Sequence, residues 1–130
     1  MPNTTQSRGA ARAAERTVGP WLDFDLKDQI EQLRQEPYWQ SGRNSKTIAH
    51  YADFRLVMTA LKANTTIQEH RTAGRLAVQI LQGHVQMHAG GRDFDLPTGR
   101  ILVLDQTVPY ELHATEDSAL LLTVAWPEED

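Results

Sequence analysis

The sequence contains no cysteine and no long hydrophobic run, and each absence excludes a class of protein. Without cysteine there can be no disulfides, thiolate metal sites or cysteine nucleophile. No apolar segment approaches the roughly 20 residues that a membrane-spanning helix needs, so we expect no membrane partner. Basic residues are not in excess: 13 Lys and Arg against 17 Asp and Glu give a formal charge of −4. Because phosphate binding requires a basic face, we also expect no nucleic-acid partner.

Several common catalytic motifs are missing as well. The chain has no GxGxxG or Walker loop to hold phosphates, no HExxH pair to hold zinc, and no GxSxG turn to present a serine nucleophile. Ser45 and Ser118 have no neighbouring base motif. The sequence therefore identifies no catalytic residue.

The composition that is present suits one small globular domain. The 130 residues are 40% hydrophobic, which is too high for a disordered chain and enough for one core. Residues 1–18 carry Arg8, Arg12 and Arg16 against a single Glu15, and we interpret them as a flexible basic tail. Because this segment lacks the continuous apolar stretch of a secretory signal, we expect a cytoplasmic protein.

One helix is predicted, over Trp21–Glu36. Its apolar residues recur at helical spacing and form one stripe, which consists of Leu22, Leu26, Ile30 and Leu33. Asp23 or Asp25 can cap the first turn, and Pro37 ends the helix. We assign residues 19–44 to this helix and a linker.

From residue 45 to residue 127 the pattern changes to short extended runs separated by turns, which we interpret as one barrel domain. The predicted strands are Phe54–Lys62, Arg75–Gln82, His84–His88, Asp93–Leu96, Ile101–Leu104, Tyr110–Ala114 and Ala119–Trp126. Gly90 and Gly91 predict a hairpin turn, and Pro97 with Gly99 predicts another. Short strands with such turns and a single helix are typical of a sandwich or barrel.

Two segments resemble the motifs of the cupin superfamily. They are HRTAGRLAVQILQG (His70–Gly83) and LPTGRILVLDQTVPY (Leu96–Tyr110), each an apolar strand with a glycine at one end. The resemblance implies an all-β fold, namely a single cupin-like jelly-roll β-barrel, here with one N-terminal helix. It also implies a homodimer, since cupins commonly cover their edge strands by pairing.

The resemblance also implies where a metal would bind in a typical cupin. Its four ligand positions fall on His70, Thr72, Leu76 and Tyr110, of which only His70 is a usual ligand. Because a catalytic site needs about three protein ligands, we expect no bound metal and no other cofactor. The same positions would instead line a cavity for a small-molecule ligand, together with inward residues such as Met58 and Val78.

Alternation along the predicted strands indicates which of the remaining side chains face the interior of the barrel and which face outward. Val85 and Met87 are expected to point inward, which places the intervening side chains of His84, Gln86 and His88 on the outer face. His113 is expected to face away from Tyr110. On the last strand, one stripe is expected to pack on the helix or on a second subunit; it consists of Leu120, Leu122, Val124 and Trp126.

Three functions remain open from the sequence. The leading hypothesis is a small-molecule-binding or sensing module without a tightly bound metal. The alternative is a metal-dependent cupin enzyme, a dioxygenase, isomerase or lyase, with a rearranged ligand set around His70. The third is a structural dimer that serves as a partner subunit. Arg71 and Arg75 could receive a carboxylate at the cavity mouth, and Arg55 could neutralise an acidic ligand.

Overall fold

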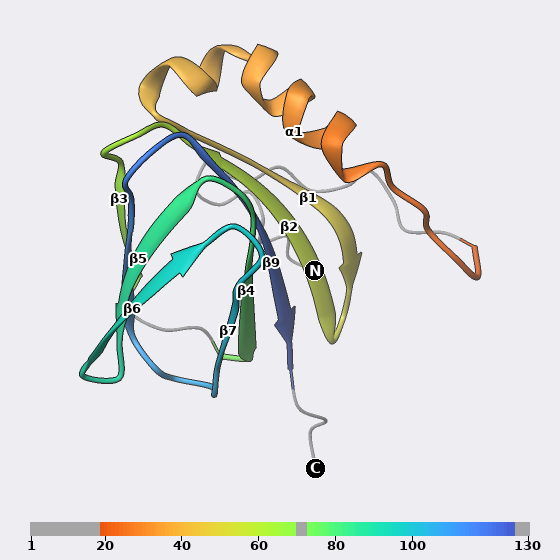
Figure 1. The fold of residues 1–130 in the computed structure, drawn as a ribbon. Helices are drawn as coiled ribbons and strands as arrows, with labels where there is room; N and C mark the ends of the chain where they lie inside the picture. Colours follow the sequence, from red (N-terminus) through yellow and green to blue (C-terminus); the bar gives the residue numbers. More distant parts are fainter. Residues whose placement is uncertain (1–18, 70–72, 127–130) are drawn as a thin grey trace.

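A computed structural model describes residues 19–69 and 73–126 of the chain. Within these ranges the chain forms one α-helix, one 3₁₀ helix and nine strands (Figure 1). In chain order the elements are α1 (Leu26–Gln35), η2 (Pro37–Ser41), β1 (Arg43–Tyr51), β2 (Phe54–Leu61), β3 (Thr66–Glu69), β4 (Arg75–Gln82), β5 (His84–Ala89), β6 (Arg92–Pro97), β7 (Ile101–Leu104), β8 (Tyr110–Ala114) and β9 (Ser118–Ala125). The predicted tail, residues 1–18, lies outside the described residues.

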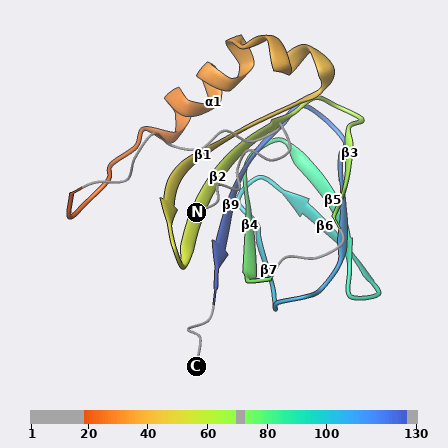
Figure 2. The same ribbon diagram turned by 180° about the vertical axis from the view of Figure 1, so that it is seen from behind.

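The strands form two antiparallel sheets that face each other (Figures 1 and 2). The five-stranded sheet has the order β1-β2-β9-β4-β7, and the four-stranded sheet has the order β3-β8-β5-β6. The predicted all-β class with one α-helix is confirmed within the described residues. No helix in the described part of the chain is long and apolar enough to cross a lipid bilayer.

The main hydrophobic core lies between the two sheets. Its buried side chains come from alternate positions of the strands and include Leu76, Val78, Ile80, Val85, Met87, Leu96, Leu112 and Leu120. Leu122 and Val124 pack against the same core. The expectation that their stripe on the last strand packs on the helix or on a second subunit is therefore wrong, because this face of β9 is the inner face of the barrel.

A second, smaller core joins α1 to the outer face of the five-stranded sheet. Ile30 and Leu33 of the helix pack there against side chains of β1, β2 and β9. The helix begins at Leu26, later than the predicted Trp21, because the Asp25 carboxylate caps it by accepting a hydrogen bond from the backbone N–H of Asp28 at 3.2 Å. Helix α1 thus covers one part of this face.

The remainder of the outer face, toward β7, is not covered by α1 (Figure 1). Two large apolar side chains of this edge strand, Ile101 and Val103, are 54% and 62% exposed. A homodimer could bury them, and the homodimer stays a prediction.

The turn predicted at Gly90 and Gly91 is confirmed. Both residues have positive φ, 58° and 79°, and they connect β5 to β6 in an antiparallel hairpin. Two consecutive positive φ angles define the hairpin turn whose twist matches the flanking strands. Glycine adopts this conformation without steric cost, which is why the sequence signal was reliable.

Candidate functional site

The two sheets enclose a cavity of about 100 Å³ between the β1–β2 end of one sheet and the β3–β8 end of the other. Polar and apolar side chains both line it: Arg43, Ser45, Val57, Thr59, Ile67, Tyr110, Leu112, Leu120 and Leu122. The cavity is mostly enclosed. A concave space with a few polar groups among apolar ones is the usual form of a small-molecule site.

The polar lining comes mainly from the inner faces of β1 and β2. Ser45 pairs directly with Thr59 across the two strands, so both side chains lie on the same face. Their hydroxyl oxygens are buried and lie 2.9 Å apart, in hydrogen-bond contact. Arg43 lies two residues before Ser45 on the same side of β1, and its side chain also lines the cavity. The result is a cation and two hydroxyls at one wall.

Tyr110 approaches the same cavity from the opposite sheet, at the start of β8. It is half-buried and packs against the barrel core. The prediction that Tyr110 faces inward and His113 does not is confirmed, because Leu112 and Ala114 are buried while His113 contacts Thr66 on the outer face. Of the predicted ligand-binding residues that belong to the described part of the chain, Tyr110 lines this cavity.

Leu76 and Val78 lie where the sequence placed them, on the inner face of β4. They are 2% and 0% exposed and are packed among the side chains of the main core. They do not line the cavity near β1 and β2. At these two positions the barrel interior is solid hydrophobic core.

Met58 requires a correction. The sequence placed it inside the barrel, but it is fully buried in the second core, beneath α1 on the outer face of the sheet. The side chains of β2 alternate as predicted, but the two faces were assigned the wrong way round. Val57 and Thr59 face the cavity, while Met58 and Ala60 face the helix. Because side chains alternate with a period of two, choosing the wrong face exchanges every residue of the strand.

His70 and Thr72, with Arg71 between them, lie outside the described residues, so their predicted roles stay predictions. The described part of β3 ends at Glu69, which pairs with Tyr110 of β8. His70 is therefore the next residue in the chain after the strand partner of Tyr110.

The described residues do not fit a metal. Leu76, at one ligand position of the cupin motif, is buried among aliphatic side chains, and Tyr110 occupies another. Across residues 19–69 and 73–126, no three His, Asp or Glu side chains are grouped so as to hold an ion.

A second set of charged groups lies at the end of the β1–β2 hairpin. The Arg55 guanidinium stacks over the Trp126 ring, 4.8 Å from its centroid, and burial lowers the pKa of Arg55. Burial, followed by the neighbouring charge of Arg55, lowers the pKa of His50, which favours its neutral form. Both side chains are half-buried.

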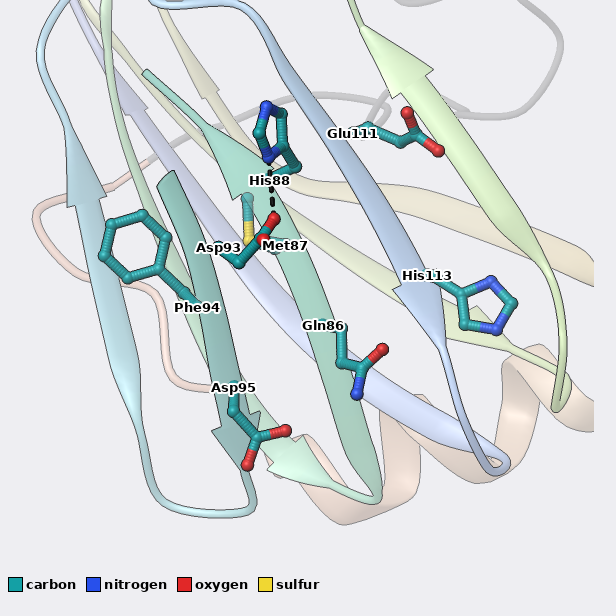
Figure 3. Close-up of a pocket in the computed structure, with 8 residues that line it drawn as sticks. All are labelled: Gln86, Met87, His88, Asp93, Phe94, Asp95, Glu111 and His113. Carbon is teal, nitrogen blue, oxygen red and sulfur yellow. Dashed lines mark hydrogen bonds and ion pairs between the residues drawn. The ribbon is translucent and has the colours of Figure 1, made fainter. Parts of the chain in front are cut away.

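The outer face of the four-stranded sheet carries a separate, open hollow of about 470 Å³ (Figure 3). His88 and His84 make hydrogen bonds of 2.7 Å to Asp93 and Asp95 respectively on the adjacent strand β6. Gln86, Glu111 and His113 also line it. The predicted outward placement of His84, Gln86 and His88 is confirmed, since Val85 and Met87 between them are buried.

Arg75, one of the two arginines predicted to receive a carboxylate at the cavity mouth, forms an ion pair within the chain. Arg75 Nε lies 3.0 Å from a carboxylate oxygen of Asp105, and both side chains are exposed. This pair links the start of β4 to the residue after β7. It lies outside the set of residues that line the internal cavity.

No protein-family profile matches the sequence, and no curated protein sequence is significantly similar to it. Solved structures do match. A conserved protein of unknown function from Streptococcus pyogenes superposes with a TM-score of 0.68 at 23% identity, over 88% of this chain and 95% of that one. A cupin superfamily protein from Desulfitobacterium hafniense superposes with a TM-score of 0.63 at 14% identity, over 65% and 78%. The chain has the cupin fold.

Another cupin-like match is a salicylate 1,2-dioxygenase from Pseudoaminobacter salicylatoxidans, with a TM-score of 0.69 at 16% identity. The match covers 78% of this chain but only 34% of the dioxygenase chain. Identities this low establish the cupin fold and do not carry an activity across. The sequence resemblance to cupins is thus confirmed for the fold.

Proposed function

We propose that this cupin-fold chain is a small-molecule-binding module and that its ligand occupies the internal cavity. The observation that carries the proposal is the mixed lining of that cavity, in which Arg43 and the Ser45–Thr59 hydroxyl pair adjoin aliphatic side chains. The main core cluster between the sheets consists of hydrophobic residues. Polar groups buried in such a core cost free energy, so their placement beside a cavity is explained by a ligand.

The hydroxyl pair of Ser45 and Thr59 has one hydrogen-bond donor more than its mutual bond uses. Ser45 and Thr59 each have one O–H donor, and their mutual hydrogen bond uses one of the two. The second O–H is then available to a ligand in the cavity. Valine in place of Thr59 would fill nearly the same space without any such requirement, since valine has nearly the shape of threonine.

Filling the cavity tests this proposal. Val57→Phe adds an aromatic ring at the cavity wall and is expected to abolish binding of any ligand that occupies the space. The measurement is a thermal-shift screen of the wild-type chain against small organic acids, sugars and phenolics, repeated with the variant for every compound that stabilises the wild type.

The matched control is Val103→Phe, the same substitution at an exposed position on β7 outside the cavity. It is expected to keep the stabilisation by every hit. Hits that survive Val57→Phe unchanged would place the binding site elsewhere and contradict the proposal. Absence of any hit across the library would favour the purely structural alternative.

The second candidate function is a metal-dependent enzyme centred on His70, and the likeness in fold to the dioxygenase supports it. Our main proposal predicts less than stoichiometric manganese, iron, nickel or zinc in protein purified without chelator, as measured by elemental analysis. Stoichiometric metal that is lost in His70→Ala and kept in His88→Ala, a histidine of the outer face, would establish the alternative and contradict our proposal.

A further inference from the structure

We propose that the outer face of the four-stranded sheet carries a second binding site, which takes a neutral oligosaccharide. This site is separate from the internal cavity, so the inference goes beyond the proposed function. It depends on three properties of the face: its shape, the side chains that line it, and the hydrogen bonds that hold those side chains in place.

Two adjoining hollows on this face form one groove. The open hollow of about 470 Å³ lies over β5, β6 and β8 (Figure 3), and a second one of about 420 Å³ lies beside it, toward β3 and the β5–β6 turn. His88 and Glu111 line both hollows, and they are direct partners on β5 and β8. Each hollow has the volume of a typical small-molecule site, about 300–1,000 Å³. The groove therefore has room for a ligand of several linked rings.

The outward side chains of this face form two rows across the sheet. Direct pairing between the strands defines the first row as Gln68, Glu111, His88 and Asp93, and the second as Thr66, His113, Gln86 and Asp95. Side chains that are paired directly on one face lie about 5 Å apart. Every member of the two rows can form hydrogen bonds, and the rows contain both donors and acceptors. Such a set matches hydroxyl groups, because each hydroxyl both donates and accepts.

Hydrogen bonds between the strands hold two histidine rings of these rows in place. His88 Nδ1 lies 2.7 Å from a carboxylate oxygen of Asp93, and His113 Nδ1 lies 2.8 Å from the Thr66 hydroxyl. Each of these bonds orients a ring without using its other nitrogen, Nε2, which can contact a ligand. Side chains that are already oriented lose less conformational entropy when a ligand binds.

The Gln86 side chain occupies the middle of the first hollow. Figure 3 shows it between the side chains of Asp95 and His113, and it is exposed. Its amide offers two N–H donors and one carbonyl acceptor, so it can bind two neighbouring hydroxyls of a sugar ring. Pro109 lines the second hollow with an apolar ring, against which the C–H face of a sugar can pack. An apolar ligand, by contrast, would leave the polar groups of the groove without partners.

Titrations with neutral tetrasaccharides test the inference, and the probes are maltotetraose, cellotetraose, mannotetraose and xylotetraose. Each is too large for the internal cavity of about 100 Å³, so this experiment and Val57→Phe test different sites. Followed by amide NMR of the wild-type chain, at least one tetrasaccharide is expected to give saturable shifts at Gln68, Gln86 and Glu111. Gln86→Ala is expected to weaken its binding about ten-fold or more, since one or two hydrogen bonds are lost.

Gln79→Ala is the matched control, because Gln79 is an exposed glutamine of β4 in the other sheet. It is expected to leave binding unchanged. Absence of saturable shifts at the groove with all of the tetrasaccharides, or binding that Gln86→Ala leaves unchanged, would overturn the inference. Tetralysine is titrated as well, because Asp93, Asp95 and Glu111 line the groove. Saturable shifts with tetralysine and with none of the tetrasaccharides would show a site for cations and overturn the inference too.

Discussion

Leu76→Glu is expected to lower the free energy of unfolding by about 3 kcal/mol or more at about pH 7. The position corresponds to a metal-ligating glutamate in the cupin motif, but in this chain its side chain is buried in the main core between the sheets. A carboxylate there would lose its hydration among aliphatic neighbours. Chemical denaturation monitored by circular dichroism measures the change.

The same variant should show a characteristic pH dependence. Burial raises the pKa of a carboxyl group in the folded state above its value of about 4.3 in the unfolded chain. Between those two pKa values the folded state binds a proton that the unfolded state does not, so lowering the pH favours folding. The deficit relative to the wild type should therefore shrink as the pH falls from about 7 toward about 5.

The control for this position is Leu76→Met, which conserves volume and polarity and is expected to cost less than about 1.5 kcal/mol. A Leu76→Glu variant as stable as the wild type at neutral pH would show that the position is not solid core. Stabilisation of that variant by a divalent metal ion would show that the barrel retains the ligand geometry, contrary to our interpretation.

Gly83→Ala is expected to destabilise the protein by about 3 kcal/mol. Gly83 has a φ of 89°, and a Cβ there would collide with the Ser118 hydroxyl and the Asp117 carbonyl. The left-handed conformation costs roughly 1–2 kcal/mol for a residue with a side chain, and overpacking adds typically 1–3 kcal/mol. The Ser118 hydroxyl cannot move freely, because it accepts from the His84 N–H and donates to the Glu116 carbonyl.

Gly91→Ala separates the cost of the left-handed backbone conformation from the cost of the steric clash. Gly91 has a similar φ of 79°, but a Cβ there would meet nothing within 4 Å. Its substitution is expected to cost only the conformational part, about 1–2 kcal/mol. Equal destabilisation of the two variants in denaturant titrations would show that Gly83 is not held close to the β8–β9 turn.

The strands that sequence reasoning located well share one property. Arg75–Gln82, Ile101–Leu104 and Tyr110–Ala114 each combine an apolar face or run with turn residues at their ends, and their bounds agree with the structure. Period-two alternation identifies such strands because one face is buried in the core. The assignment of Val85 and Met87 to the interior follows from the same signal.

Sequence reasoning missed the wall of the cavity that β1 forms, because the inner face of this strand is polar. Strand β1 was assigned in part to a linker, and its inner face carries Arg43, Ser45 and Thr47 instead of apolar residues. A bulge between Thr47 and Ala49 also shifts the register, which interrupts the alternation. A strand whose inward residues are polar gives no hydrophobic signal, and such departures from simple patterning are expected where a binding site is built.

The sequence of β2 does not show which of its two faces points into the barrel, because side chains on both faces are buried. Met58 and Ala60 face the helix, while Val57 and Thr59 face the cavity. Alternation alone distinguishes the two faces without saying which one is inside. Arg55 and Thr59 lie on the same face of β2 as Val57, and their polarity could have identified it as the inner face. Polar residues are easier to accommodate beside a cavity than under a helix.

The most direct test of small-molecule binding in the cavity is a methyl NMR titration of the wild-type chain with a compound that stabilises it. We predict saturable shifts in the methyl groups of Val57, Ile67 and Leu112, which line the cavity from both sheets. The methyl groups of Ile101 and Val103, on the exposed outer face of β7, should not change. Saturable shifts confined to Ile101 and Val103, or no saturable shift at the cavity, would contradict this account.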